Sequence, residues 1–303
     1  MKKTVIGKTE LRELSRQDLI DSVSYRNVSL LLSLGADSLY QEMVPIGKIC
    51  RFLVKRICRT SDVKRNRKRA IAFLRFVAPS VLLEDFPESE KTVVIGFNHP
   101  SLGEIFRLMY LGLEAYPDRD FFFPVNIPWF ENLSPVIPLL EANGVYLTPM
   151  ITPSTQKKLE KQFEDDEDAL EMVKHYKSAF EREYMIASKS MAERKAVIVV
   201  APSATRQATV FLNEEEKRGE GHIHPTMTLL ARSILRSDES EAVFVPVVVF
   251  EPEDNNRKLN LFKPYRIEPC KPFETEEIKE LTEGRKRDFD YQFLLRIDEK
   301  YTK

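Results

Sequence analysis

The sequence predicts an α/β protein in which a mixed β-sheet is flanked by helices and preceded by a helical segment at the N-terminus. From about residue 86 onward, short runs rich in β-branched residues alternate with helical segments, which is the pattern of an α/β domain. Before that point, apolar residues recur at helical spacing and strand signals are scarce. We therefore expect two parts, a helical segment at 1–85 and an α/β domain at 86–303.

The individual elements follow from local composition. In the N-terminal part, Ile49, Leu53 and Ile57 share one face of a predicted helix. The Pro-punctuated stretch 121–143 predicts a buried bend and a short helix. Residues 155–195 predict one long or broken helical region, whose acidic part is expected to be a solvated face. The expected strands are 92–97, 144–147, 197–201 and 243–250.

The composition is that of an ordinary folded protein. The 303 residues are 43% hydrophobic and 31% charged, and 46 Lys and Arg nearly balance 47 Asp and Glu, so the net charge forecasts no particular partner. Three cysteines without a CxxC pair fit a reducing compartment. His222 and His224 in GHIHP lack further ligands nearby and predict an exposed turn, so we expect no metal. Charged residues interrupt the N-terminal stretch that a signal peptide would need, and no apolar run approaches the roughly 20 residues needed to cross a bilayer. We therefore expect a cytoplasmic protein that can touch the inner face of a membrane.

The stretch VVIGFNHPSLGE at 93–104 puts a histidine where a predicted strand gives way to a helix. Ser101 and Glu104 have the S-x-x-E spacing of a capping box. The position of His99 is also typical of a histidine that lies in a turn and is hydrogen-bonded to the backbone. The same spacing can turn the Glu104 carboxylate back toward His99, where it would hold one ring tautomer and stabilise the imidazolium. A structural cap and a general-base pair are both open on this spacing alone.

The block NHPSLGE resembles the first signature of the phospholipid/glycerol acyltransferase family, the lysophosphatidic acid acyltransferase-like enzymes, whose pattern is NHxSxxD. Here Glu104 stands in place of the Asp. The run VIVVAPSATRQ is similar to the family's strand followed by FPEGTR. Its Pro202, Thr205 and Arg206 match, whereas Ser203 takes the place of the Glu and an Ala that of the Gly.

Two further blocks complete the resemblance. VFVPVVVF resembles the family's final strand with its Val-Pro, here Val245 and Pro246. ANGVYL resembles the second block, with Gly144 matching and the family's Arg absent. The resemblance covers about 90–250 and leaves the N-terminal helices outside it.

The resemblance implies a glycerolphosphate acyltransferase-like fold and transfer of an acyl chain from a thioester, on coenzyme A or acyl carrier protein, to a hydroxyl of glycerol phosphate or a lysophospholipid. It makes His99 the base that deprotonates the acceptor, with Glu104 orienting it. The substrate-binding residues that it implies are Asn98, Ser101, Ser203, Thr205 and Arg206. An Arg suits phosphate because its fork binds two oxygens, while a surface salt bridge is the alternative for Arg206. No cofactor is implied beyond the thioester donor, and the divergent acceptor blocks leave the acceptor open.

Two other functions compete with acyl transfer. In a serine-dependent hydrolase or two-step acyltransferase, Ser203 would be the nucleophile and His99 and Glu104 would complete the triad. The sequence APSAT, however, lacks the glycines of a nucleophile elbow. A non-catalytic lipid-binding protein that kept the fold is the third reading.

The region 48–77 carries eleven Lys and Arg against one acid, Asp62. A helix with Phe52, Leu53 and Ile57 on one side can lie on anionic lipid as a peripheral membrane contact, and the same cations can recruit an acidic carrier protein. Alternatively, the apolar side packs on the α/β domain and the charges face water. We expect no nucleic-acid partner, because no recognised fold or stacking motif accompanies the charge.

Overall fold

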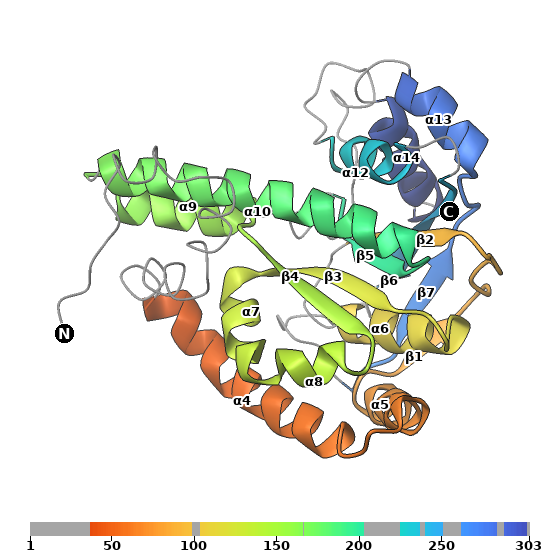
Figure 1. Ribbon diagram of the computed structural model, residues 1–303, viewed down its shortest axis with the longest axis horizontal. Helices are drawn as coiled ribbons and strands as arrows, with labels where there is room; N and C mark the ends of the chain where they lie inside the picture. Colours follow the sequence, from red (N-terminus) through yellow and green to blue (C-terminus); the bar gives the residue numbers. More distant parts are fainter. Residues whose placement is uncertain are drawn as a thin grey trace. The chain divides into compact units, whose positions relative to one another are not determined.

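A seven-stranded mixed sheet organises the computed structural model, which describes residues 37–98, 104–165, 167–202, 225–236, 240–250, 262–283 and 288–301. The strand order is β1-β7-β6-β2-β5-β3-β4 (Figure 1). The strands are β1 (Ser80–Leu82), β2 (Thr92–Phe97), β3 (Phe121–Asn126), β4 (Val145–Met150), β5 (Val197–Val200), β6 (Ala242–Phe250) and β7 (Tyr265–Pro269). The prediction of an α/β fold with a mixed sheet is confirmed.

The described helices alternate with these strands along much of the chain. The α-helices are α4 (Asp37–Ile57), α5 (Val63–Val77), α6 (Glu104–Ala115), α7 (Ile127–Leu133), α8 (Ile137–Glu141), α9 (Pro153–Gln162), α10 (Glu167–Glu193), α12 (Thr226–Ile234), α13 (Thr275–Glu283) and α14 (Asp288–Tyr301), and η1 (Ser134–Val136) is a 3-10 helix. The helical region expected at 155–195 is therefore broken between α9 and α10. Within the described ranges, no helix is both long and apolar enough to cross a bilayer.

The centre of the sheet is parallel and carries the first and third signature blocks on neighbouring strands. β2 pairs in parallel with β5 on one side and with β6 on the other. Every residue of β2 is buried, as expected for a strand covered on both faces. The antiparallel pairing of β6 with β7 makes the sheet mixed.

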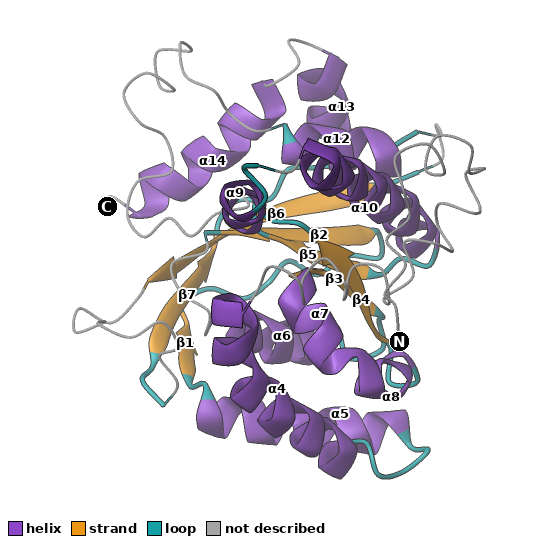
Figure 2. Cartoon of the chain, turned by 90° about the vertical axis from the view of Figure 1, so that its left-hand side faces the viewer, coloured by secondary structure: helices purple, strands orange, loops and turns teal. Residues whose placement is uncertain are grey.

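Two compact units divide the chain. Unit 1 comprises Met1–Arg56, Pro124–Leu140 and Leu147–Ile186, and unit 2 comprises Ile57–Phe123, Glu141–Tyr146 and Ala187–Lys303. Within unit 2, α5 and α6 lie on one side of the sheet, and α12 and α14 lie on the other (Figure 2). The strands that position the candidate site, β2, β5 and β6, all belong to unit 2.

Glycine at position 96 allows α14 to pack closely on β2. A Cβ atom at Gly96 would lie 2.5 Å from Cε1 and from Cζ of Phe293, which is closer than van der Waals contact permits. An aromatic side chain therefore occupies the space that a side chain at position 96 would need. Phe293 also stacks with Phe273, at 5.8 Å between ring centroids.

Three strands differ from the sequence prediction. The prediction of a bend at the start of 121–143 is wrong, because Phe121–Asn126 forms β3. Phe121 of this strand pairs with Val197 of β5. β1 lies inside the segment 1–85, which was expected to be helical, and pairs in parallel with β7. β7 itself had no predicted counterpart. All three carry a proline within the strand or directly before it, which weakens a strand signal in sequence.

Candidate functional site

The candidate site begins where β2 ends, and Asn98 is its first described residue. The buried Asn98 side chain donates from Nδ2 to the carbonyl oxygen of Val249 at 2.8 Å and accepts at Oδ1 from the backbone N–H of Val249 at 2.6 Å. The amide thereby continues the ladder between β2 and β6 by one more pair of hydrogen bonds. Asn98 was predicted to bind substrate, and the observed contacts give it a structural part in fixing the strand end.

Glu104 is the first residue of α6 and is fully buried. Its position in the first helical turn suits a carboxylate, because the N-terminal end of the helix dipole is positive. Position 104 follows the end of β2 by only seven residues along the chain. The intervening His99 and Ser101 lie outside the described residues, as does the rest of the 99–103 segment.

Arg107, which sequence reasoning missed, is a second fully buried charged residue on the same helix. Its Nε donates to the carbonyl oxygen of Pro79 at 3.0 Å, and its Nη2 donates to that of Lys263 at 2.8 Å. The guanidinium also stacks on Tyr265, 3.7 Å from the ring centroid. The three-residue spacing from Glu104, which puts both on one helix face, was the available signal in sequence. Arg107 fixes α6 to the backbone before β1 and before β7.

The third block follows β5, the neighbour of β2. Gly96 stands opposite Val200 in the parallel register, so the two strands end at the same edge of the sheet. The described chain continues through Ala201 to the buried Pro202. Ser203, Thr205 and Arg206 follow directly in sequence and lie outside the described residues, as do His222 and His224.

The fourth block lies on the other flank of β2. Pro246 of β6 stands opposite Gly96, and its carbonyl oxygen accepts from the backbone N–H of Cys270 at 2.7 Å. Because proline has no backbone N–H, a proline inside a central strand cannot donate one of the hydrogen bonds between strands. The first, third and fourth blocks are therefore aligned on three adjacent parallel strands.

The second block belongs to a different edge of the sheet. Gly144 has a positive φ of 73°, and a Cβ there would lie 2.3 Å from Nη2 of Arg67 and 2.6 Å from Oδ1 of Asp120. Asp120 directly precedes β3, so this cluster lies at the amino ends of the parallel strands, away from Asn98 and Pro202. The positive φ and the lack of space for a Cβ atom explain why position 144 is a glycine, and no contact with a substrate is needed to explain it.

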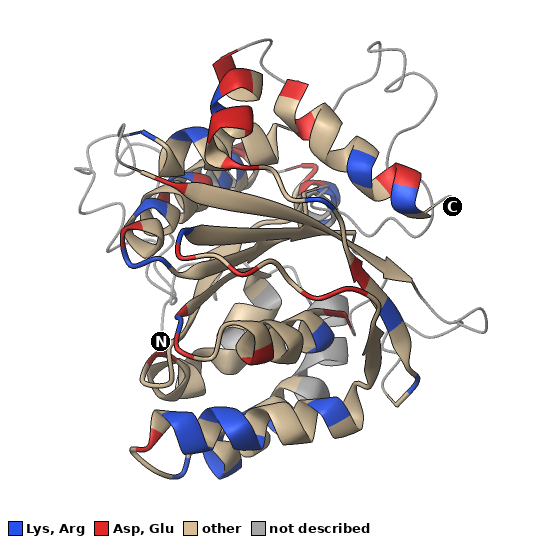
Figure 3. Ribbon diagram, turned by 90° about the vertical axis from the view of Figure 1, so that its right-hand side faces the viewer, with Lys and Arg blue, Asp and Glu red and all other residues tan. Residues whose placement is uncertain are grey.

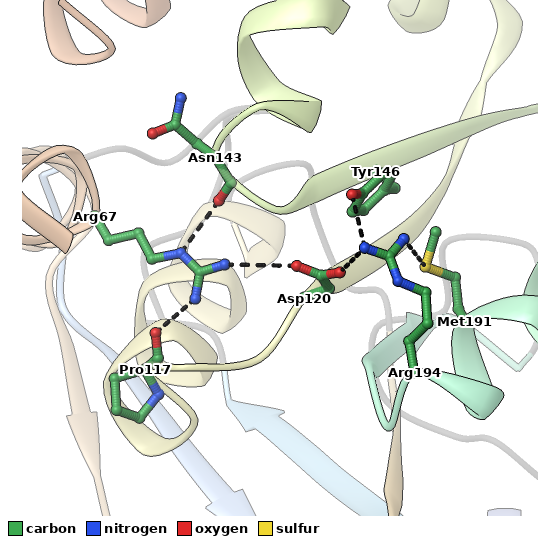
Figure 4. Close-up of polar contacts among 7 residues, drawn as sticks. All are labelled: Arg67, Pro117, Asp120, Asn143, Tyr146, Met191 and Arg194. Carbon is green, nitrogen blue, oxygen red and sulfur yellow. Dashed lines mark hydrogen bonds and ion pairs between the residues drawn. The ribbon is translucent and has the colours of Figure 1, made fainter. Parts of the chain in front are cut away.

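Arg67 anchors that cluster (Figure 4). It donates to the carbonyl oxygens of Asn143 at 3.1 Å and Pro117 at 2.6 Å and lies 4.0 Å from Asp120. Asp120 in turn forms a 2.6 Å ion pair with Arg194. Burial lowers the pKa of the Arg67 guanidinium, and the nearby Asp120 opposes that shift. The network has a structural role in holding α5 against the turns at 117–120 and 143–144.

The basic region 48–77 is thus not a uniform cationic face. It spans α4 and α5, and Asn66 and Arg67 of α5 are buried. On α4 the predicted apolar side is divided, because Phe52 is exposed whereas Leu53 and Ile57 are half-buried.

Comparison with known proteins adds no family. No protein-family model matches the chain, and no curated protein sequence matches it. Among the described residues, no three His, Cys, Asp or Glu side chains are grouped as metal ligands would be. The interpretation of the site therefore rests on the residue blocks and on their arrangement along the sheet.

Proposed function

We propose that the protein is an acyltransferase that moves a fatty acyl group from a coenzyme A or acyl-carrier-protein thioester to a hydroxyl of a lysophospholipid or a similar glycerol-phosphate acceptor. One observation carries the proposal: the blocks NHPSLGE and APSATR follow β2 and β5, which are adjacent and parallel, with Gly96 opposite Val200. In open α/β sheets, ligands bind beyond the carboxyl ends of such strands. Asn98 and Pro202, the last described residues after these two strands, therefore lie at one edge of the sheet.

The chemistry assigned to this edge is a single displacement. His99 takes the proton of the acceptor hydroxyl as its oxygen attacks the carbonyl carbon of the thioester. The tetrahedral intermediate collapses by breaking the C–S bond, and the departing thiolate takes the proton back from the imidazolium. The products are an ester and a free thiol, so no redox partner or metal is needed for the balance.

Glu104 has the properties required of the group that orients such a base. It is fully buried, and a carboxylate in a low-dielectric setting interacts more strongly with an imidazolium than one in water does. Its helix is fixed by Arg107 through two backbone carbonyls. A base held by a rigid carboxylate keeps the ring tautomer that leaves one nitrogen free to accept a proton.

The test is release of free thiol from a panel of acyl-CoA and acyl-carrier donors, with and without a mixture of lysophospholipids and glycerol phosphate. Acyl transfer predicts release that depends on the acceptor, together with an acylated product detected by mass spectrometry. The discriminating variant is Ser203→Ala, which removes the nucleophile that a serine hydrolase needs but leaves His99 in place, so acceptor-dependent transfer should persist. Acceptor-independent release that disappears in Ser203→Ala would instead identify a serine hydrolase. No release with any donor would contradict the proposal and favour the lipid-binding reading.

A further inference from the structure

Two exposed phenylalanines from distant parts of the chain are held together on unit 2. Phe76, near the end of α5, is 75% exposed, and Phe262, just before β7, is 63% exposed. Their rings meet edge to face with centroids 6.2 Å apart. The backbone N–H of Phe262 donates to the carbonyl oxygen of Val77 at 2.8 Å, which ties the two segments.

The backbone at Phe262 is in an unfavourable region. Its φ is +65°, in the left-handed region, which a bulky side chain rarely adopts. Strain of this kind persists only where the surroundings enforce it and is concentrated at functional positions. The hydrogen bond to Val77 and the contact with Phe76 hold this conformation, and it leaves a large apolar ring mostly exposed.

Edge strand β1 exposes apolar side chains on the other face of the sheet. Val81 stands opposite Arg266, and the guanidinium of Arg266 lies 4.9 Å from the ring centroid of Phe250, which stacks on Tyr301 of α14. Ser80, the neighbour of Val81, contacts Tyr110 of α6, so alternation along the strand turns Val81 away from α6. The apolar part of the surface beside α5 is therefore the pair Phe76 and Phe262.

Positive charge borders these side chains along α5. The helix contains no acidic residue (sequence VKRNRKRAIAFLRFV), and its exposed cations are Lys64, Arg65, Lys68 and Arg75. Figure 3 shows the blue segments along this helix, at the bottom of the view. Lys64 and Arg75 pair with Asp118 and Glu114, whereas the side chains of Arg65 and Lys68 have no ion-pair partner among the described residues. Lys263, next to Phe262, is also exposed.

Arg107 of α6 holds the backbone next to the apolar part of this surface in place. Its two hydrogen bonds end on the carbonyls of Pro79, just before β1, and Lys263, just before β7. The segments next to Phe76 and Phe262 are therefore fixed to α6. A preformed surface loses less conformational entropy when it binds.

We propose that this aromatic-basic surface, formed by Phe76 and Phe262 and the exposed cations of α5, docks the protein on an anionic lipid bilayer. Aromatic rings that enter the interface, bordered by Lys and Arg facing lipid headgroups, are the features of peripheral membrane binding. A second copy of the chain fits less well, because two-fold pairing would bring the cationic face of α5 near its own image. An acidic protein would use the cations but gives no reason for the strained, exposed Phe262. The proposal does not depend on acyl transfer.

The experiment is co-sedimentation of the full chain with vesicles of phosphatidylcholine alone or with about 30% phosphatidylglycerol. One variant is Phe76→Ser combined with Phe262→Asn, because Asn tolerates the left-handed conformation. The other is Arg65→Glu combined with Lys68→Glu. The controls are Leu229→Ser on α12 and Arg236→Glu after it, which change an exposed apolar residue and an exposed cation on the other side of the sheet. Circular dichroism confirms that each variant is folded.

We expect binding to the anionic vesicles only, with each double variant weakening it by about tenfold or more and the controls leaving it unchanged. Salt at about 0.5 M should weaken the remaining electrostatic part. Equal binding by the Phe variant would overturn the proposal, as would binding to neither vesicle. Loss of a dimer in the Phe variant, measured by sedimentation without vesicles, would assign the surface to self-association and also overturn it.

Discussion

Two buried carboxylates, Asp290 and Glu104, lie at the starts of two helices on opposite sides of the sheet (Figure 2), and they differ in the helix whose first turn they belong to or cap. Asp290 of α14 accepts from the N–H groups of Met227 at 2.7 Å and Thr228 at 3.1 Å and from the hydroxyl of Thr228. These donors belong to the first turn of α12, whose N-cap residue Pro225 makes no side-chain cap bond. Asp290 thus caps α12 from another helix.

Glu104 differs because it belongs to the helix that it begins and follows His99 in a signature block. Both side chains are almost fully buried. Burial of a carboxylate at a helix start is therefore no sign of catalysis by itself. What separates the two residues is their partners, which are cap donors for Asp290 and, in the proposal, an imidazole for Glu104.

The largest effect in this comparison is expected from Asp290→Ala. The change leaves two buried N–H groups without acceptors, and we expect the free energy of unfolding to fall by about 3–4 kcal/mol. Urea denaturation measures it, with Glu283→Ala at the exposed end of α13 as a control that should change little. Activity per folded molecule should not change. A stable but inactive Asp290→Ala protein would mean that this carboxylate, too, serves the reaction.

The next effect is a dependence of stability on pH. Burial raises the pKa of the Asp290 carboxyl from 3.8 to about 6, although the bonds from Thr228 and Met227 act to lower it. Between these two pH values the native state binds more protons than the unfolded state, so the free energy of unfolding falls as the pH rises. The difference of about two pKa units corresponds to roughly 3 kcal/mol.

Denaturation of the native protein and Asp290→Asn at several pH values tests this dependence. The native protein should lose stability relative to the variant as the pH rises from about 4 to 6. Parallel curves for the two proteins would show that Asp290 does not titrate in this range.

A smaller effect is expected from Glu104→Gln, which keeps the shape but removes the charge. Positioning of the base would weaken, and we expect the transfer rate to fall by about 10- to 100-fold, or roughly 1.4–2.7 kcal/mol in the barrier. The rate at saturating acceptor, with thermal unfolding as the fold control, measures this. If stability falls as it does for Asp290→Ala while the rate per folded molecule is kept, Glu104 is a structural residue like Asp290.

The sequence predicted the centre of the fold better than its edges. The β2 prediction has the observed bounds, Thr92–Phe97, and β6 begins one residue early, at Ala242, because buried parallel strands are continuous β-branched runs. β1 is only three residues long, and β3 contains Pro124, so neither gives a clear periodic signal. Each of these strands exists because a neighbouring strand supplies its partner, which is β7 for β1 and β5 for β3.

The parts of the site that depend on distant contacts were also beyond local reasoning. Arg67 belongs to a basic run that favours exposure. Its burial is explained by distant partners, the carbonyls of Pro117 and Asn143 and the carboxylate of Asp120. Asp290 caps backbone groups more than 60 positions earlier in the chain. By contrast, the junction at 98–104 was visible because its strand end, proline and helix start are consecutive in sequence.

The most direct test of the central claim is the rate of acceptor-dependent thiol release by His99→Ala compared with the native protein, under conditions where both are folded. If the segments after β2 and β5 form one acyl-transfer site with His99 as its base, the rate should fall by about 10²–10⁴-fold with no change in the unfolding midpoint. A folded His99→Ala protein that transfers acyl groups at the native rate would contradict the account.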